Sequence, residues 1–380
     1  MEKRKTIIKI VIISIIVLGL IIVSSLYVTD SNFRLSVDKF LNKELSENNL
    51  KTIEISSEDN PVVHAYDKYI AVLTKGVLKC YDKSGSNISS IDVNITSPMM
   101  NSNDKYLVIG ENGGKNFCVI YENELLWQGS VEGSISKINI NSNGYVSVIV
   151  TNTTYKSVVI VYNPKGVDLF KIYLSSTYAL CTDISNNNRY LAIGEVDYSG
   201  TIIKSKIKII SMDLAKNDPE NSIINSYESE AGEVITSLNY QIGDNAYCMF
   251  SNYIQNVNHN GNERIVDFNE NTLFADINAK NSLVIFEKQS SGLLSNEYQI
   301  RIMNLSTKKE VLYFEDLSLI KSLKTSGENI ALNFVNSVQI LTKKGWLSKK
   351  YTSTKEIKDI IVAEDIAGII YKDKIEIIKL

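Results

Sequence analysis

Residue types that usually carry catalysis or hold metals are scarce in this chain of 380 residues. Its two histidines, His64 and His259, lie far apart, and neither has a second metal ligand at a standard spacing. Carboxylate pairs such as Glu364-Asp365 stand in turns between apolar runs, where solvated side chains are the ordinary explanation. The Asp/Asn-rich stretch 183–188 lacks the glycine and final glutamate of a calcium loop. No GxSxG, P-loop or Rossmann pattern occurs, so we expect no catalytic residues, no metal and no cofactor.

The four cysteines also give no sign of chemistry. None belongs to a CxxC pair, and each lies in an apolar stretch, at Cys80, Cys118, Cys181 and Cys248. Because cysteine is among the most buried residue types, we expect four buried side chains within strands. Disulfide bonds stay open as an alternative if the domain lies outside the cell.

The best candidates for binding lie in long connections between paired apolar runs. The most distinctive is 195–205, which combines two carboxylates, a tyrosine and Gly200, a residue that permits a sharp bend. We predict that residues of these connections form one rim of a binding surface. The rim would consist of Tyr155, Glu195, Asp197, Tyr198 and Tyr298. Solvated loops of variable length are the alternative explanation.

The elements that must position these loops come from a repeat of about forty residues. Each copy is an apolar run, a small polar turn and a second apolar run led by Tyr or a β-branched residue, as in 63–72, 100–108 and 183–192. A period of this length built only from strands is typical of a β-propeller. The units predicted are 62–92, 96–131, 135–174, 178–228, 233–268, 272–315, 318–352 and a partial unit at 356–380.

The blade count depends on how the last unit is completed. It contains only three strands, and the segment from Leu50 to Ser56 alternates in a way that could supply the fourth. That pairing would close the ring and leave no long open edge, so an all-β propeller of eight blades is predicted. Seven blades is the alternative, because 233–268 is poorly patterned and 178–228 is overlong.

The N-terminal segment predicts a membrane anchor. A basic tip at residues 1–6 precedes an apolar run at 7–28 that is long enough to cross a bilayer. Cations ahead of the run predict a cytoplasmic N-terminus and an extracytoplasmic propeller at 50–380, on a single-pass protein of the cell membrane. A cleaved signal peptide is the competing interpretation.

A short amphipathic stalk helix is predicted over residues 29–49. Its apolar residues recur at helical spacing, at Phe33, Val37, Phe40, Leu41 and Leu45. The pattern covers too few turns for a dimerising coiled coil, so packing against the propeller or the bilayer surface is expected.

Copies that end in Tyr-Leu-Ala or Tyr-Ile-Ala, with turns such as Asn103-Asp104-Lys105, resemble the WD40-like and quinoprotein-like propellers. The order of basic tip, membrane helix, stalk and diverged propeller resembles an uncharacterised family of membrane-anchored propeller proteins from low-GC Gram-positive bacteria. The chain lacks the repeated Trp-Asp dipeptide of WD40 blades and the tryptophan docking motif of quinone-dependent dehydrogenases. The resemblance therefore implies a fold but carries over no catalytic residue.

Composition and pattern together predict a binding protein. A formal net charge of −3 argues against a nucleic-acid partner, which would need a concentrated basic face. We expect a non-enzymatic, membrane-tethered propeller that serves as a binding or scaffold module for an envelope protein or polymer. The alternatives are an enzyme that processes glycans or peptides with channel carboxylates, and an extracytoplasmic sensor subunit.

Overall fold

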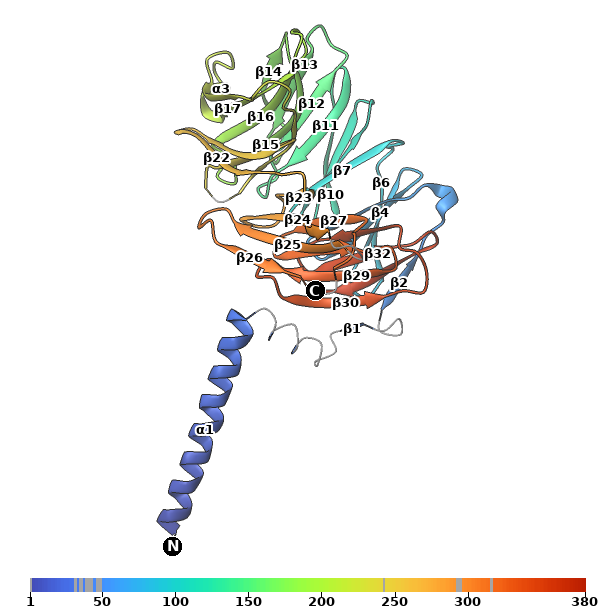
Figure 1. Cartoon of the computed structure of the whole chain (residues 1–380). Coiled ribbons are helices and arrows are strands. Elements are labelled where there is room, and N and C mark those ends of the chain that lie inside the picture. The colour runs from blue at the N-terminus through green and yellow to red at the C-terminus, as the bar shows by residue number, and fades with distance from the viewer. Residues whose placement is uncertain are drawn as a thin grey trace.

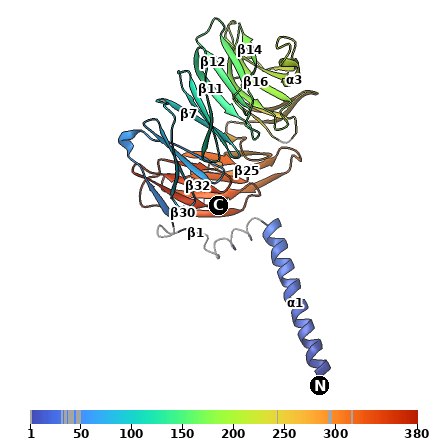
Figure 2. The same ribbon diagram turned by 180° about the vertical axis from the view of Figure 1, so that it is seen from behind.

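The computed structural model of the protein describes residues 2–30, 33, 37, 44–45, 50–241, 243–291, 296–314 and 317–380. Helix α1 (Glu2–Thr29) stands apart from a ring of β-strands in both views (Figures 1 and 2). Its segment Val11–Thr29 has a mean hydropathy of 2.8 and packs against almost nothing, so it is long and apolar enough to cross a membrane.

The strands form eight sheets, each built on an antiparallel meander of four strands. Seven of these meanders use four consecutive strands, and the eighth combines β31, β32 and β33 with β2 from before the first blade. Blade 1 contains β3 (Val62–Tyr66), β4 (Tyr69–Thr74), β5 (Val77–Tyr81) and β6 (Asn87–Asp92). Blade 2 contains β7 (Pro98–Asn103), β8 (Tyr106–Glu111), β9 (Asn116–Tyr121) and β10 (Glu124–Ser130). Blade 3 contains β11 (Ser134–Ile140), β12 (Val146–Thr151), β13 (Ser157–Tyr162) and β14 (Asp168–Leu174). Blade 4 contains β15 (Tyr178–Ile184), β16 (Tyr190–Asp197), β17 (Lys204–Ser211) and β18 (Ile223–Glu228).

The second half of the ring repeats the pattern. Blade 5 contains β19 (Ile235–Tyr240), β20 (Ala246–Phe250), β21 (Tyr253–Asn258) and β22 (Gly261–Asp267). Blade 6 contains β23 (Thr272–Asp276), β24 (Ser282–Ser291), β25 (Asn296–Asn304) and β26 (Glu310–Tyr313). Blade 7 contains β27 (Ser322–Ser326), β28 (Asn329–Asn333), β29 (Ser337–Thr342) and β30 (Leu347–Thr352). Blade 8 contains β31 (Asp359–Val362), β32 (Ile366–Ile370), β33 (Lys374–Lys379) and β2 (Lys51–Glu54).

The polar turn of the repeat joins the two innermost strands of each blade. Several of its residues have positive φ, among them Asp67 at 46°, Asp104 at 52° and Asn188 at 59°. Tight hairpins require this conformation, and Asp, Asn and Gly reach it at lowest cost. Turn chemistry therefore explains why these residue types recur in each copy.

Adjacent blades pack face to face, which buries both faces of the inner strands. Between blades 2 and 3, for example, Val108 and Val119 of one sheet meet Ile138, Val148 and Ile160 of the next. A strand buried on both faces has a continuous apolar run, which β13 shows over residues 158–161. The four cysteines occupy such positions, buried and free, as predicted.

The ring closes through a strand from before the first blade. β2 pairs antiparallel with β33, with Ile53 opposite Ile375, so N-terminal and C-terminal strands lie side by side (Figure 1). Ile53 is buried in a cluster between blades 8 and 1. Because hydrogen bonds across the seam join the two ends, the eight-blade prediction is confirmed.

The two irregular units that suggested seven blades are both complete four-stranded blades. In unit 178–228, long second and third strands are followed by a short helix, α3 (Met212–Ala215). Unit 233–268 has four regular strands, although its outermost strand β22 is mostly exposed and polar. A short 3-10 helix, η2 (Ser57–Asp59), connects β2 to blade 1.

Of the predicted stalk helix at 29–49, the structure describes residues 29–30, 33, 37 and 44–45, and Phe33 and Val37 are helical. The rest of the segment lies outside the described residues. Within that segment, Glu44 and Leu45 form the short strand β1 (Glu44–Leu45), which runs parallel to β30 on the outer edge of blade 7. Leu45 therefore belongs to a strand, and its predicted place in a helix is wrong. The residue packs against the cluster between blades 7 and 8, which supplies an apolar contact that does not depend on helical spacing.

Candidate functional site

The ring has two faces with different connections. One face carries the turns between the first and second strands and between the third and fourth strands of each blade, and we call it the turn face. The opposite face carries the second-to-third loops and the blade-to-blade connections, and we call it the loop face. Antiparallel meanders impose this division, because successive strands run in opposite directions.

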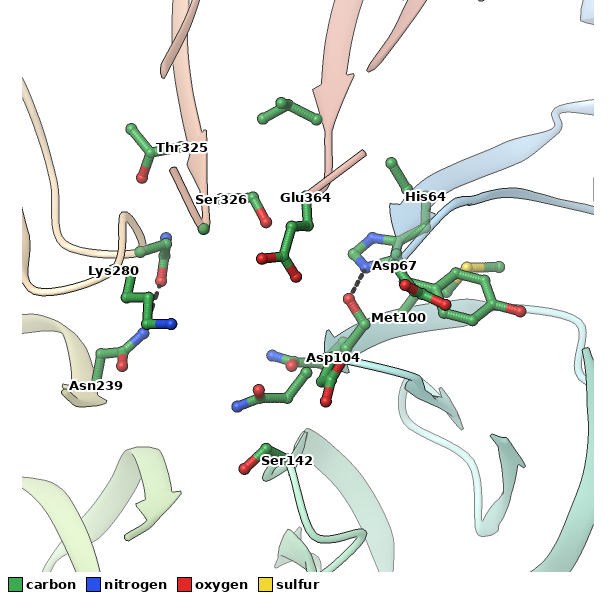
Figure 3. A pocket seen from close by; sticks show the side chains of 18 of the residues that line it. His64, Asp67, Met100, Asp104, Ser142, Asn239, Lys280, Thr325, Ser326 and Glu364 are labelled. Carbon is green, nitrogen blue, oxygen red and sulfur yellow. Dashed lines mark hydrogen bonds between the residues drawn. The ribbon is translucent and has the colours of Figure 1, made fainter. Parts of the chain in front are cut away.

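A central cavity of about 570 Å³ opens on the turn face (Figure 3). All eight blades line it through their first turns and the adjoining ends of their innermost strands. One lining residue from each blade in order is His64, Ser102, Ser142, Asn186, Gln241, Lys280, Thr325 and Glu364. The lining is thus mainly polar, although the hydrophobic clusters between the blades surround the cavity.

Hydrogen bonds between neighbouring turns hold the cavity wall. Asn141 Nδ2 donates to the carbonyl of Ser185, 3.2 Å away, which links blade 3 to blade 4. Gln241 Nε2 donates to the carbonyl of Ile277 at 2.6 Å, and Gln241 Oε1 accepts from the backbone N–H of Asn281 at 2.8 Å. Blades 5 and 6 are therefore joined in both directions. A wall tied in this way changes shape little when a ligand enters.

His64 and Ser102 form a nucleophile–base contact at the cavity, and Thr325, which also lines it, donates its hydroxyl to the Asp276 carboxylate at 2.6 Å. His64 Nε2 lies 2.8 Å from Ser102 Oγ and links blades 1 and 2. Burial, aided by the charge of Lys324, lowers the pKa of His64 to about 4. General-base catalysis favours a pKa near the operating pH, so this imidazole is a weak base for activating a hydroxyl. Its geometry fits a structural hydrogen bond between blades.

Four charged side chains line the cavity: Asp67, Asp104, Glu364 and Lys280. Figure 3 shows the Glu364 carboxylate pointing into the open space. None of the four forms an ion pair within the described part of the chain, whereas Lys105, beside Asp104 on the same turn, has one. Burial raises the pKa of Asp67, and the nearby Asp104 carboxylate raises it further. Three carboxylates against one ammonium group suit a cationic or hydrogen-bonding ligand.

The carboxylates do not form a metal site. Among the described residues, no three Asp, Glu, His or Cys side chains converge closely enough to hold one ion. Asp183, in the calcium-loop-like stretch, accepts hydrogen bonds from Asn139 Nδ2 and from the backbone N–H groups of Ile184 and Tyr240. Burial nevertheless raises the pKa of Asp183 to about 7. Its carboxyl group is thus committed to holding blades 3, 4 and 5 together.

A second candidate lies on the loop face, where blades 3 and 4 present four tyrosines. Tyr155 packs against Tyr173 with ring centroids 4.7 Å apart, and Tyr178 packs against Tyr198 at 5.7 Å. Lys156 connects the two pairs, since its Nζ lies 5.3 Å from the centroid of Tyr178. We call these five residues the tyrosine surface. Tyr155, Tyr173 and Tyr198 are 41%, 53% and 52% exposed, an unusual exposure for rings that also contact one another.

The structure brings together part of the predicted rim. Tyr155 and Tyr198 both belong to the tyrosine surface, and Asp197 lies directly beside Tyr198. The Asp197 carboxylate accepts hydrogen bonds from the N–H and hydroxyl of Ser199, which shape the loop. These bonds lower the pKa of Asp197. Tyr173 and Tyr178 were not predicted, because they lie on strands and their exposure depends on how the two blades meet.

Two of the predicted rim residues do not lie there. Glu195 is fully buried in β16, not in an exposed loop, where it accepts a hydrogen bond from Thr177 and forms an ion pair with Lys208 at 2.8 Å. β16 extends through Asp197, so Glu195 lies within the strand. The Lys208 cation on the neighbouring strand β17 compensates the buried Glu195 carboxylate. Tyr298 lies in blade 6, where it stacks on Phe286 at 5.3 Å and contributes to a core cluster.

Sequence reasoning placed the binding surface on the loop face and missed the cavity on the turn face. The available signal was the repeat itself, whose Asn- and Asp-rich turns all project from the same face of a propeller. Only the closed ring shows that side chains such as Asp67, Asp104 and Glu364, far apart in sequence, border one space.

The fold and these two faces define the protein as an eight-bladed β-propeller with one apolar N-terminal helix. The chain belongs to the family described as "Family of unknown function (DUF5711)", which matches residues 42–380. No curated protein matches it.

Solved structures share the fold at low sequence identity. The crystal structure of BamB from Moraxella catarrhalis is similar with a TM-score of 0.53 and 12% identity, over 87% of this chain and 98% of that chain. The C-terminal WD40 domain of Sif2 gives a TM-score of 0.59 and 11% identity, over 89% of this chain and 99% of that chain. The likeness at these identities concerns the fold alone.

Proposed function

We propose that this protein is a membrane-tethered, non-catalytic binding module whose propeller docks an envelope protein outside the cytoplasm. In this proposal residues 1–6 are cytoplasmic, residues 7–28 cross the membrane as part of α1, and residues 50–380 form the exposed ring. The basic residues ahead of the apolar segment support this orientation. An uncleaved helix keeps the ring close to the envelope components it would bind.

The position of the tyrosine surface carries the proposal. The segment that follows α1 pairs with blade 7 through β1, so the tether approaches the ring at that blade. The tyrosine surface belongs to blades 3 and 4, about halfway round the ring from blade 7. In Figure 1, β13, β14 and β16 accordingly lie at the end of the molecule far from α1. A partner could reach these tyrosines without meeting the tether.

The chemistry of the surface suits a protein more than a polymer. Tyrosine supplies a large contact area together with a hydroxyl, and it is enriched where protein interfaces concentrate their binding energy. The loop that carries Tyr198 also exposes Ile202 and Ile203, at 58% and 38%. Exposed aliphatic side chains beside exposed rings favour a partner with apolar side chains over a glycan rich in hydroxyl groups.

Site-specific photocrosslinking in intact cells tests the proposal. A photoreactive phenylalanine analogue at Tyr198 should form an adduct with an envelope protein. The matched control is the same analogue at Tyr121, which is 37% exposed and packs against Tyr106 at 4.8 Å, but on the turn face. This control should not capture the same protein.

Binding of the purified partner then decides whether the tyrosines carry the affinity. Tyr155→Ala combined with Tyr198→Ala should weaken binding at least about tenfold, as expected when interface aromatic residues are truncated. The thermal midpoint should hardly change, because both rings are exposed. Unchanged affinity in this double variant would refute the proposal. A crosslinked adduct that contains a glycan polymer would show that the partner is a polymer and not a protein.

A further inference from the structure

The turn between β29 and β30 of blade 7, residues 342–346, is a tight hydrogen-bonded turn on the turn face. Gly345 adopts a φ of 72°, and its N–H donates to the carbonyl of Thr342 at 2.8 Å. A Cβ at Gly345 would lie 2.6 Å from Val311 of β26, so the turn is also pressed against blade 6. We call residues 342–346 the Trp346 turn, because the Trp346 side chain is its largest group.

The Trp346 turn contacts the end of α1. The Tyr27 ring lies edge-on to the Trp346 ring, with centroids 6.0 Å apart and planes at 61°. Tyr27 is two residues from Thr29, where both the helix and its apolar stretch end. β1 pairs farther along the strand that follows the turn, with Glu44 opposite Lys350 and Leu45 opposite Tyr351 of β30. Two separate contacts therefore place the N-terminal segment along blade 7, and the first of them sets the end of α1 against the Trp346 turn.

The length of the apolar stretch fixes the depth of these aromatic residues. Nineteen residues at about 1.5 Å per residue span about 28 Å, close to the roughly 30 Å of a hydrocarbon core. If α1 crosses the membrane, Tyr27 must then lie near the bilayer surface, and Trp346 lies there with it. Tryptophan and tyrosine both favour the headgroup level of a bilayer.

The charge of the turn fits the same location. Lys344 is exposed, and its Nζ lies 5.5 Å from the centroid of the Trp346 ring. An ammonium group beside an indole can contact lipid phosphates while the ring enters the headgroup layer. Lys343, by contrast, forms an ion pair with Glu328 of the same blade at 2.6 Å.

We infer that the Trp346 turn is a membrane-contact site at which blade 7 rests on phospholipid headgroups. The inference depends on the anchoring role of α1 in the proposed function. It adds an orientation that the anchor alone does not give. The rim of the turn face at blade 7 meets the bilayer, while the tyrosine surface, across the ring and on the other face, points away from it.

Depth-dependent fluorescence quenching tests this inference with the full-length chain in liposomes. The protein has two tryptophans, so Trp127→Phe leaves Trp346 as the only one. Lipids with a nitroxide at the headgroup should remove most of the Trp346 emission. Lipids with the nitroxide deep in the acyl chain should remove much less.

The equivalent turn of blade 3 provides a matched control. It contains Lys165-Gly166-Val167, where blade 7 has Lys344-Gly345-Trp346, and Val167 is 54% exposed. A chain with Val167→Trp and both native tryptophans changed to Phe should show no quenching by either lipid. In anionic liposomes, Lys344→Gln should reduce the quenching of Trp346, and Lys165→Gln should not.

Two different failures can be told apart. If the chain stays with the vesicles after an alkaline wash but the emission of Trp346 is as insensitive as that of the blade 3 control, the membrane-contact site is refuted and the anchor stands. If the chain washes off the vesicles, the anchoring role of α1 is refuted, and the membrane-contact site falls with it.

Discussion

At the scale of single residues, His64 should make the stability of the ring sensitive to acid. An unfolded histidine takes up a proton below about pH 6.5, whereas burial and Lys324 lower the pKa of His64 in the fold to about 4. Between these values the unfolded chain binds more protons, so the free energy of unfolding should fall as the pH falls. The expected slope is at most about 1.4 kcal/mol per pH unit.

The variant His64→Gln isolates this effect, because an amide can still bond with Ser102 but does not titrate. Asp183, whose pKa burial raises to about 7, contributes the opposite slope over the same range. The quantity to measure by denaturant unfolding is therefore the difference between variant and wild type as a function of pH. Ser102→Ala should destabilise the fold while keeping the acid sensitivity. A wild-type slope in His64→Gln would contradict the assignment.

At the scale of elements, the strand that closes the ring should contribute strongly to stability. Ile53 of β2 is 3% exposed and packs with Ile375 and Ile377 of β33 between blades 8 and 1. Ile53→Ala should lower the free energy of unfolding by about 3 kcal/mol, from lost burial and the cavity left behind. Denaturant titration of the full-length chain in detergent micelles measures the loss.

The outer strand β6 offers the matched substitution Ile88→Ala. Ile88 is 39% exposed on the outermost strand of blade 1, the same position that β2 holds in blade 8, so its truncation should change stability by less than about 0.5 kcal/mol. Equal losses at Ile53 and Ile88 would mean that β2 is not needed to hold the ring closed.

The same elements show what the sequence could predict. The inner hairpins were predictable because turn residues such as Asp67 and Asn188 are of types that favour the positive φ of a tight turn. The apolar runs beside them indicate buried strands. The closing strand was predictable from the alternation around Ile53. The burial of Glu195 was not, because it depends on Lys208 from the next strand. The cavity was not predictable either, since eight turns meet there only after the ring has closed.

At the scale of the whole molecule, the buried cysteines make the orientation of the protein measurable. All four are at most 6% exposed, and burial raises the pKa of Cys118 and Cys181 to about 12. Because the thiolate is the reactive form, the native protein should give almost no background with a maleimide. A single cysteine introduced at an exposed position will then report which side of the membrane it occupies.

Two such positions lie at opposite ends of the molecule. Thr201 lies in the exposed loop that carries Tyr198, and Lys3 belongs to the basic tip ahead of the apolar segment. With a membrane-impermeant maleimide, Thr201→Cys should be labelled in intact cells, and Lys3→Cys only after the membrane is permeabilised. Labelling in the reverse order would place the ring in the cytoplasm. The tyrosine surface would then face cytoplasmic partners, although the contact between Trp346 and the bilayer would still be expected on that side.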